Sequence, residues 1–162
     1  MRRVITLVMV IALASFAFAA DNDAITINYD VDPINELEIT DGSVSLTVNS
    51  ATAGSEPDAA TTASSTYGIT TNEDAKKITA AIDSDMEDNV TLSIDVSAPS
   101  TGTGAGSTDI SATATGAAAD VVTAIGAVAE SGLNIDFDLS ATVAAGTISG
   151  GSRTLTLTVT DS

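Results

Sequence analysis

The sequence contains neither cysteine nor histidine. Without cysteine the chain cannot form a disulfide, a thiolate nucleophile, a thiolate metal site or a lipid-modified cysteine anchor. Without histidine it lacks the side chain most often used as a general base and a metal ligand, and neither a Cys–His pair nor a Ser–His–Asp triad can be assembled. We therefore expect a protein that is not an enzyme and that has no cofactor, with Ca²⁺ as the one candidate, considered below.

Cations are also scarce, with five Lys and Arg residues against 22 Asp and Glu residues. Two of the five are Arg2 and Arg3, so residues 21–162 hold three cations against all 22 acids, a net charge of −19. A field of this sign repels phosphate groups and anionic lipid surfaces. Nucleic acid and anionic membranes are therefore not expected as partners.

Long apolar runs are absent, apart from one near the N-terminus. Met1-Arg2-Arg3 is a positive start, Val4–Leu13 is apolar apart from one threonine, and Ala17-Phe18-Ala19 fits the small-x-small cleavage rule. This layout is typical of a secretory signal peptide, and the apolar run is too short for a permanent membrane span. We expect cleavage of residues 1–20, a single domain over residues 21–162 without an integral membrane segment, and a secreted protein in the periplasm, at the cell surface or in the medium.

What the remaining sequence does contain is alternation of apolar and polar residues. This period-two pattern occurs in Ile25–Tyr29, Val44–Val48, Ile78–Ile82, Val90–Val96, Leu133–Val143 and Leu155–Val159. Such a row predicts a strand with one buried and one solvated face. Short strands separated by turn residues predict an all-β fold, an antiparallel Ig-like β-sandwich of about eight or nine strands.

Connections between the rows give further expectations. Asn72-Glu73-Asp74 predicts a hairpin turn between strands at Tyr67–Thr71 and Lys77–Ile82. The polar stretches Ser50–Thr66 and Pro99–Thr108 predict long exposed loops. Ala117–Ser131 fits either a short helix or a strand. Its β-branched residues and Gly126, which costs about 1 kcal/mol in a helix interior, favour the strand.

An acidic cluster is the candidate metal site, formed by Asp83, Asp85, Glu87 and Asp88. Calcium prefers six to eight oxygen ligands, and acids at alternate loop positions can converge on one ion. The spacing begins like an EF-hand loop, but Asp88 occupies the position that needs glycine and Ile94 occupies the position of the bidentate glutamate. Two interpretations remain, a calcium site of another kind and a solvated turn.

A second pair of acids, Asp136 and Asp138, has the spacing that glycoside hydrolysis requires. The pair is expected on the exposed face of a strand, where nothing would desolvate either carboxylate. Few aromatic residues are present to stack against a sugar. We interpret the pair as solvated, and a hydrolase is the weakest of three functional hypotheses.

The closing segment Arg153–Asp161, RTLTLTVTD, resembles the last strand of bacterial Ig-like and pilin-type surface domains. This resemblance covers one strand and the overall pattern of strands, and it includes no family-defining motif. It implies a structural or adhesive role at a surface.

Both ends of the expected domain contain strands suited to pairing with another chain. Thr154–Thr160 is uncharged and strongly β-prone, and as an edge strand it would be unprotected. Ile25–Tyr29 could pair with its own sheet or with a neighbour's. The candidate residues for strand exchange are Ile25, Ile27, Tyr29, Leu155, Leu157 and Val159.

Two main functional hypotheses follow. The first is a structural subunit of a filament, pilus-like fibre or matrix, which associates with its own copies or with other surface proteins. The alternative is a monomeric binding module for a carbohydrate, a protein or Ca²⁺ that uses the two long loops.

Overall fold

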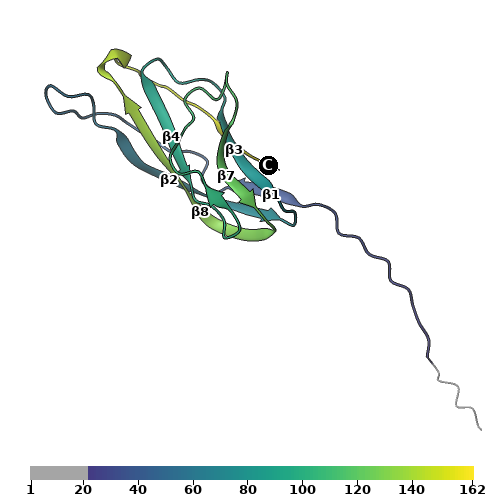
Figure 1. Cartoon of the computed structure of the whole chain (residues 1–162). Helices are drawn as coiled ribbons and strands as arrows, with labels where there is room; N and C mark the ends of the chain where they lie inside the picture. Colours follow the sequence, from purple (N-terminus) through teal and green to yellow (C-terminus); the bar gives the residue numbers. More distant parts are fainter. Residues whose placement is uncertain (1–21) are drawn as a thin grey trace, which may run out of the picture. The chain divides into compact units, whose positions relative to one another are not determined.

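The computed structural model describes residues 22–162, apart from the side chains of residues 61–63. The predicted signal peptide lies outside the described residues. The chain divides into two units, Met1–Val31 and Asp32–Ser162. Residues 22–31 of the first unit contain no regular secondary structure, and every strand belongs to the second unit (Figure 1).

The second unit consists of nine strands within the described residues, which confirms the prediction of an all-β protein. They are β1 (Asn35–Ile39), β2 (Ala60–Thr71), β3 (Lys76–Ile82), β4 (Val90–Val96), β5 (Thr103–Gly104), β6 (Thr108–Asp109), β7 (Ala119–Ile125), β8 (Val128–Ala141) and β9 (Leu155–Asp161). A single 3₁₀ turn, η1 (Val143–Ala145), is the one helical element of residues 22–162. No helix there is both long enough and apolar enough to cross a bilayer.

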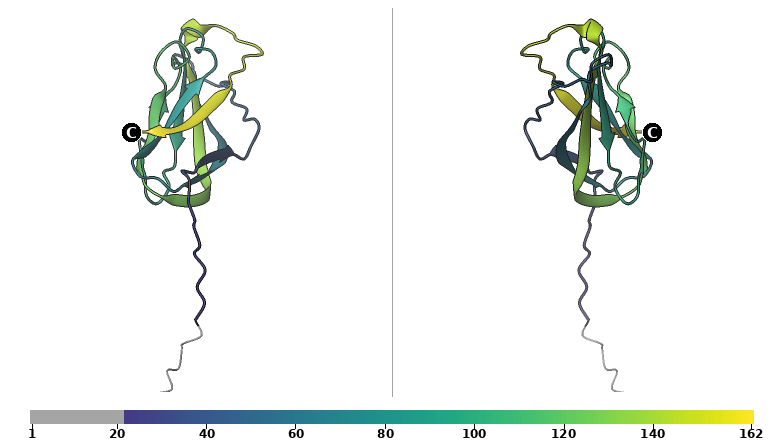
Figure 2. Two further views of the ribbon diagram at one scale, coloured as in Figure 1. Left: turned by 90° about the vertical axis from the view of Figure 1, so that its right-hand side faces the viewer. Right: turned by 90° about the vertical axis from the view of Figure 1, so that its left-hand side faces the viewer.

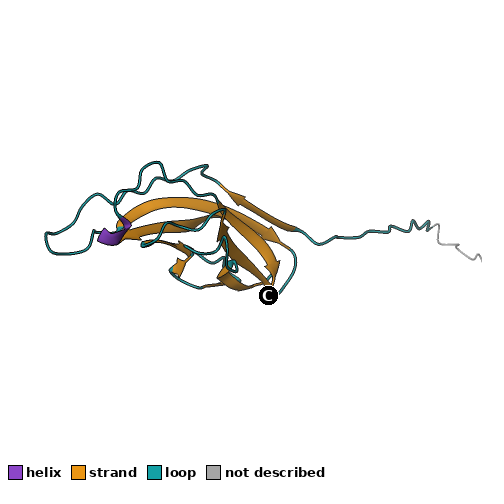
Figure 3. Ribbon diagram, turned by 90° about the horizontal axis from the view of Figure 1, so that it is seen from above, coloured by secondary structure: helices purple, strands orange, loops and turns teal. Residues whose placement is uncertain are grey.

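These strands form two antiparallel sheets. The first has the order β1-β2-β8-β4-β6 and the second the order β5-β7-β3-β9. Figure 3 shows the strands of this unit in two layers, and Figure 2 shows β9 in yellow crossing one side of the unit.

The core lies where the two sheets face each other. Burial alternates along β4, where Ile94 and Val96 are buried while Thr91 and Asp95 are exposed, as the period-two pattern predicts. Buried apolar residues from β2, β4, β8, β3, β7 and β9 belong to one cluster. Burial of a large aliphatic side chain stabilises a fold by about 1.5–3 kcal/mol, so this shared cluster is what holds the sheets together.

The predicted hairpin at residues 72–74 is wrong. β2 pairs with β1 and β8, whereas β3 pairs with β7 and β9, so the turn carries the chain from one sheet to the other. Ile69 of β2 and Ile78 of β3 are both buried in the shared core, which they enter from different sheets. The positive φ of 56° at Ala75 redirects the chain at this crossing.

Other connections differ in part from the expectation. Residues 117–131 contain β7 and the start of β8, so the strand interpretation is correct. The loop predicted over residues 50–66 is wrong in its second half, because β2 already begins at Ala60. Within the predicted loop 99–108, the short β5 forms and pairs with β7.

Two predicted strands are not part of either sheet. Ile25–Tyr29 has no ladder partner among the described residues. In the other, Val44, Leu46 and Val48 are half-buried and the residues between them are exposed, so the alternation is present without a ladder. Residues 41–49 make none of the backbone hydrogen bonds found within residues 22–162.

Candidate functional site

The N-terminal segment, defined here as Ile25–Val31, presents a row of apolar side chains to solvent. Ile25, Ile27, Tyr29 and Val31 are 75–86% exposed. They alternate with polar residues, so one face of an extended chain here would be entirely apolar. Exposed apolar side chains that lie together in such a row are typical of interaction surfaces.

Strand β9 is an edge strand of the second sheet. It pairs with β3 along its whole length, and on its other side no strand of the described chain pairs with it. Residues 154–160 carry no charge, so the edge lacks the lysines, acids or prolines that usually block further pairing. β9 is therefore an edge strand whose residues 155–160 are uncharged, and its use for pairing with another chain stays a prediction.

The hydrogen bonds at the two ends of β9 show which of its backbone N–H and C=O groups face β3 and which face the open edge. The Asp83 amide donates to the Thr154 carbonyl at 3.1 Å, and the Ser162 amide donates to the Ala75 carbonyl at 2.9 Å. In an antiparallel ladder, successive residues direct their N–H and C=O groups to opposite sides. Leu155 and Leu157 lie an odd number of residues from Thr154, so their backbone groups point to the open edge.

A cavity of about 1030 Å³ lies between the sheets beside the start of β9. It is lined on one side by residues 41–51, on another by Ser152–Leu155, and at its base by β4 and β8. Its apolar lining includes Val44, Leu46, Leu92, Ile135, Phe137 and Leu155. The sandwich is thus open at this edge, although β1 and β9 are in contact elsewhere along it.

One buried polar atom belongs to this cavity. Ser65, on β2, lines it and is only 3% exposed. Its Oγ is the buried side-chain oxygen or nitrogen without a hydrogen-bond partner in the described part of the chain. An unpartnered buried hydroxyl costs about 1–3 kcal/mol, so Ser65 supplies the cavity with one unused polar contact.

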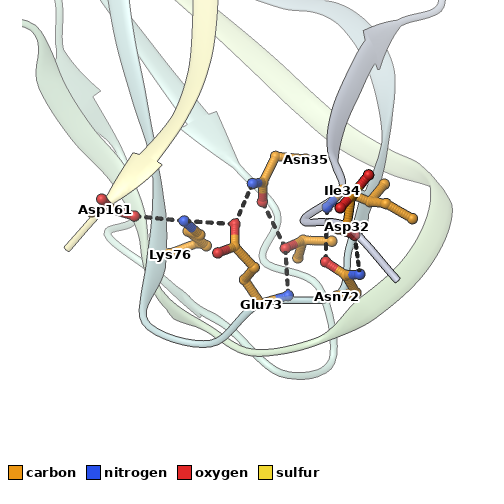
Figure 4. Close-up of polar contacts among 8 residues, drawn as sticks. Asp32, Ile34, Asn35, Asn72, Glu73, Lys76 and Asp161 are labelled. Atoms are coloured by element: carbon orange, nitrogen blue, oxygen red, sulfur yellow. Dashed lines mark hydrogen bonds and ion pairs between the residues drawn. The ribbon is translucent and has the colours of Figure 1, made fainter. Parts of the chain in front are cut away.

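The point at which the chain enters the first sheet is fixed by a polar network (Figure 4). Asn72 accepts a hydrogen bond from the Ile34 amide at 2.8 Å and donates one to the Asp32 carbonyl at 2.9 Å. The Asn35 side chain donates to Glu73 at 2.5 Å and accepts from Thr71 at 2.8 Å. The turn between β2 and β3 therefore holds the start of β1 in place.

The same network extends to the end of β9. Lys76 lies 2.9 Å from Glu73 and 2.5 Å from Asp161. The hydrogen bond to Asp161, followed by that to Glu73, raises the pKa of the Lys76 ammonium. The pKa of Glu73 is lowered first by the Asn35 amide and then by Lys76. The first residues of β1 and the last of β9 are thus linked through one turn.

The predicted calcium loop is held by other contacts. Asp83 accepts a hydrogen bond from the Thr154 amide at 3.0 Å, which lowers the pKa of Asp83. Asp85 accepts from the Thr115 hydroxyl and from the Ala114 and Thr115 amides, and these bonds lower its pKa, the hydroxyl most. Each carboxylate therefore has a different structural partner.

Arg153 closes the acidic loop. Its guanidinium donates two hydrogen bonds to the Asp85 carbonyl, at 3.0 and 2.8 Å, and lies 3.0 Å from Glu87. No three acidic side chains within residues 22–162 are arranged to hold a metal ion. Calcium binding by Asp83, Asp85, Glu87 and Asp88 stays a prediction, and it would require Asp83, Asp85 and Glu87 to leave their present partners.

The acids considered for sugar hydrolysis lie on β8. Asp136 is exposed and faces Asp95 across the β4–β8 ladder, while Asp138 is half-buried and faces Ser93. Like charges directly opposite each other in a sheet destabilise it. Both acids therefore lie on the outer face of the sheet, as expected for a solvated pair.

No protein-family model, no curated protein and no solved structure matches this chain. The function is therefore inferred from the site alone. Sequence reasoning identified the N-terminal segment and β9, but it missed Ser65 and the cavity. The available signal was the position of Ser65, two residues before Tyr67 on the inward face of β2.

Proposed function

We propose that the protein is a secreted, non-catalytic surface or filament subunit with an Ig-like sandwich fold, and that its copies assemble by β-strand pairing. The observation that carries this proposal is the presence, in one chain, of an exposed alternating segment and an open uncharged edge strand. The segment is Ile25–Val31 and the edge is β9. Each is incomplete alone, and pairing would bury the apolar row and satisfy the backbone of β9.

The other sheet edges support this choice of partner surface. β1 carries the exposed acids Glu36 and Glu38, which oppose pairing with a second acidic chain. β5 and β6 have only two residues each. β9 is therefore the longest edge strand among the described residues, and its residues 155–160 are uncharged.

The test compares two variants that add the same charge to opposite faces of the segment. Ile27→Asp places a carboxylate in the apolar row, and Asn28→Asp places one on the polar face. We expect the wild type and Asn28→Asp to form filaments or oligomers, and Ile27→Asp to remain monomeric. Negative-stain imaging and analytical ultracentrifugation over a hundredfold concentration range provide the measurement. A wild-type protein that is monomeric throughout this range would refute the proposal.

The alternative function, a monomeric binding module, is favoured by one observation. The cavity of about 1030 Å³ lies at the upper end of the range of small-ligand sites. Under this alternative, Ile27→Asp would change neither the sedimentation of the protein nor its ligand binding. The same pair of variants therefore separates the two functions.

A further inference from the structure

We infer that the cavity and the open edge of β9 form one acceptor site, and that its occupant is the N-terminal segment Ile25–Val31 of a second copy, anchored by a hydrogen bond between Tyr29 and Ser65. This inference rests on the proposed function and specifies its contact. Three independent features of the described chain support it. Backbone groups on both sides of the cavity are unpaired, the apolar side chains of the segment match apolar residues of the cavity lining, and the buried Ser65 hydroxyl has no hydrogen-bond partner in the described residues.

The backbone on both sides of the cavity is available for pairing. On one side, Leu155 and Leu157 direct their N–H and C=O groups away from β3. On the other, residues 41–49 belong to no strand and make no backbone hydrogen bond. A strand that entered between them would give partners to both rows, and half-buried backbone groups strongly favour such partners.

The side chains of the segment match the two environments that β9 provides. Along β9, Leu157 points into the core while Thr156 and Thr158 are exposed. A strand added beside β9 has the same alternation. With its apolar row inward, the segment would place Ile25, Ile27, Tyr29 and Val31 against the apolar part of the cavity lining and its polar residues in solvent.

The polar contact selects Tyr29 within this row. Ser65 Oγ is buried, lines the cavity and has no partner in the described residues. Of the four inward side chains only Tyr29 has a polar atom, a phenolic hydroxyl that both donates and accepts. A Tyr29–Ser65 hydrogen bond satisfies both hydroxyls once water is excluded.

The first test uses the absence of cysteine, which makes every introduced thiol unambiguous. Full-length protein with Thr156→Cys is mixed with full-length protein carrying one cysteine at successive positions 25 to 31, and disulfides are allowed to form. We expect intermolecular disulfides at Thr26, Asn28 and Asp30 and at least fivefold less at the alternate positions. Thr91→Cys, at an exposed position of β4 in the other sheet, is the matched control acceptor and should form none.

The second test is a double-mutant cycle on the anchor. Tyr29→Phe and Ser65→Ala should each weaken association about fivefold, the effect of one hydrogen bond of roughly 1 kcal/mol. Together they should weaken it no further than either alone. Ser65→Ala should not lower the melting temperature of the monomer, because it removes an unpartnered hydroxyl.

Several results would overturn the inference. A disulfide within one chain between Thr47→Cys and Thr156→Cys, formed in the oligomer, would show that residues 41–49 themselves pair with β9. Oligomers in which all seven positions form disulfides equally well would show that the segment does not pair in register with β9. Oligomers in which the effects of Tyr29→Phe and Ser65→Ala on association add up would show that the two hydroxyls do not bond to each other. Either result would leave the proposed function intact and would place the binding site of the segment elsewhere. Absence of both oligomers and disulfides would remove the inference together with the proposed function.

Discussion

At the scale of single residues, the buried Tyr67 links two segments of the chain through its hydroxyl group. It is fully buried, and its hydroxyl donates to the Ser97 carbonyl at 2.6 Å. Since β8 lies between β2 and β4, this bond joins β2 to the residue that follows β4. Burial, and then the charge of Glu130, raise the pKa of Tyr67 to about 12.

This pKa predicts an alkaline limit to stability. The neutral phenol is favoured in the folded state, so its contribution is complete below the unfolded pKa of about 10 and is lost as the pH rises through about 12. We expect the free energy of unfolding to fall by an extra amount of order 2 kcal/mol between pH 10 and 12 in the wild type relative to Tyr67→Phe. Urea titrations at several pH values measure this difference. Equal pH dependence in the two proteins would show that Tyr67 is not the responsible group.

At the scale of elements, the acidic loop between β3 and β4 is joined by hydrogen bonds to two other segments of the chain. Asp83 joins it to the start of β9, and Asp85 joins it to the turn at Ala114 and Thr115. The lowered pKa values mean that these contacts contribute stability above the unfolded pKa of the acids and lose it as the pH falls through the lower folded values.

We therefore expect Asp85→Ala to lower the urea midpoint at pH 7 and to reduce the acid dependence of stability below about pH 4. Asp88→Ala is the matched control, because Asp88 belongs to the same cluster and takes part in none of the described hydrogen bonds or ion pairs. Thermal melts of both variants between pH 3 and pH 7 provide the comparison. A similar loss in the two variants would indicate a general charge effect in place of the Asp85 contacts.

Local pattern predicted some elements and not others. β4 and β9 were predicted well because their apolar residues alternate without interruption. The first half of β2 consists of Ala, Thr and Ser, so its alternation is not visible in the sequence. The hairpin error has a different cause, since a short turn between two strands does not specify whether they share a sheet.

The candidate site divides in the same way. The N-terminal segment and β9 are runs of neighbouring residues, so the sequence revealed both. Ser65 and the cavity depend on residues brought together from β2, β4, β8 and two loops, and no local pattern encodes that meeting.

At the scale of the whole molecule, charge opposes assembly. Residues 21–162 carry a net charge of −19, so two copies repel each other over several tens of ångströms at low salt. The proposed contact between the N-terminal segment and the β9 edge is mainly apolar and backbone-mediated. Salt therefore screens the repulsion without weakening the contact itself.

We expect association of the wild type to become at least tenfold faster when the ionic strength rises from about 0.01 M to about 0.1 M, as the Debye length falls from about 30 Å to about 10 Å. Light scattering after a rapid salt jump measures the rate. Ile27→Asp should show no association at either salt concentration. A rate that fell with added salt would indicate an interface held together by opposite charges.

The three cations of the described chain have a further consequence. Lys76, Lys77 and Arg153 each form an ion pair, and their side chains are only 12–25% exposed. Lys76 and Lys77 also lie in β3, between two neighbouring strands. We therefore expect proteases that cleave after lysine or arginine to digest the folded domain slowly. Enzymes that cleave at apolar or aromatic residues would instead reach the exposed N-terminal segment first, and would remove the part on which assembly is proposed to depend.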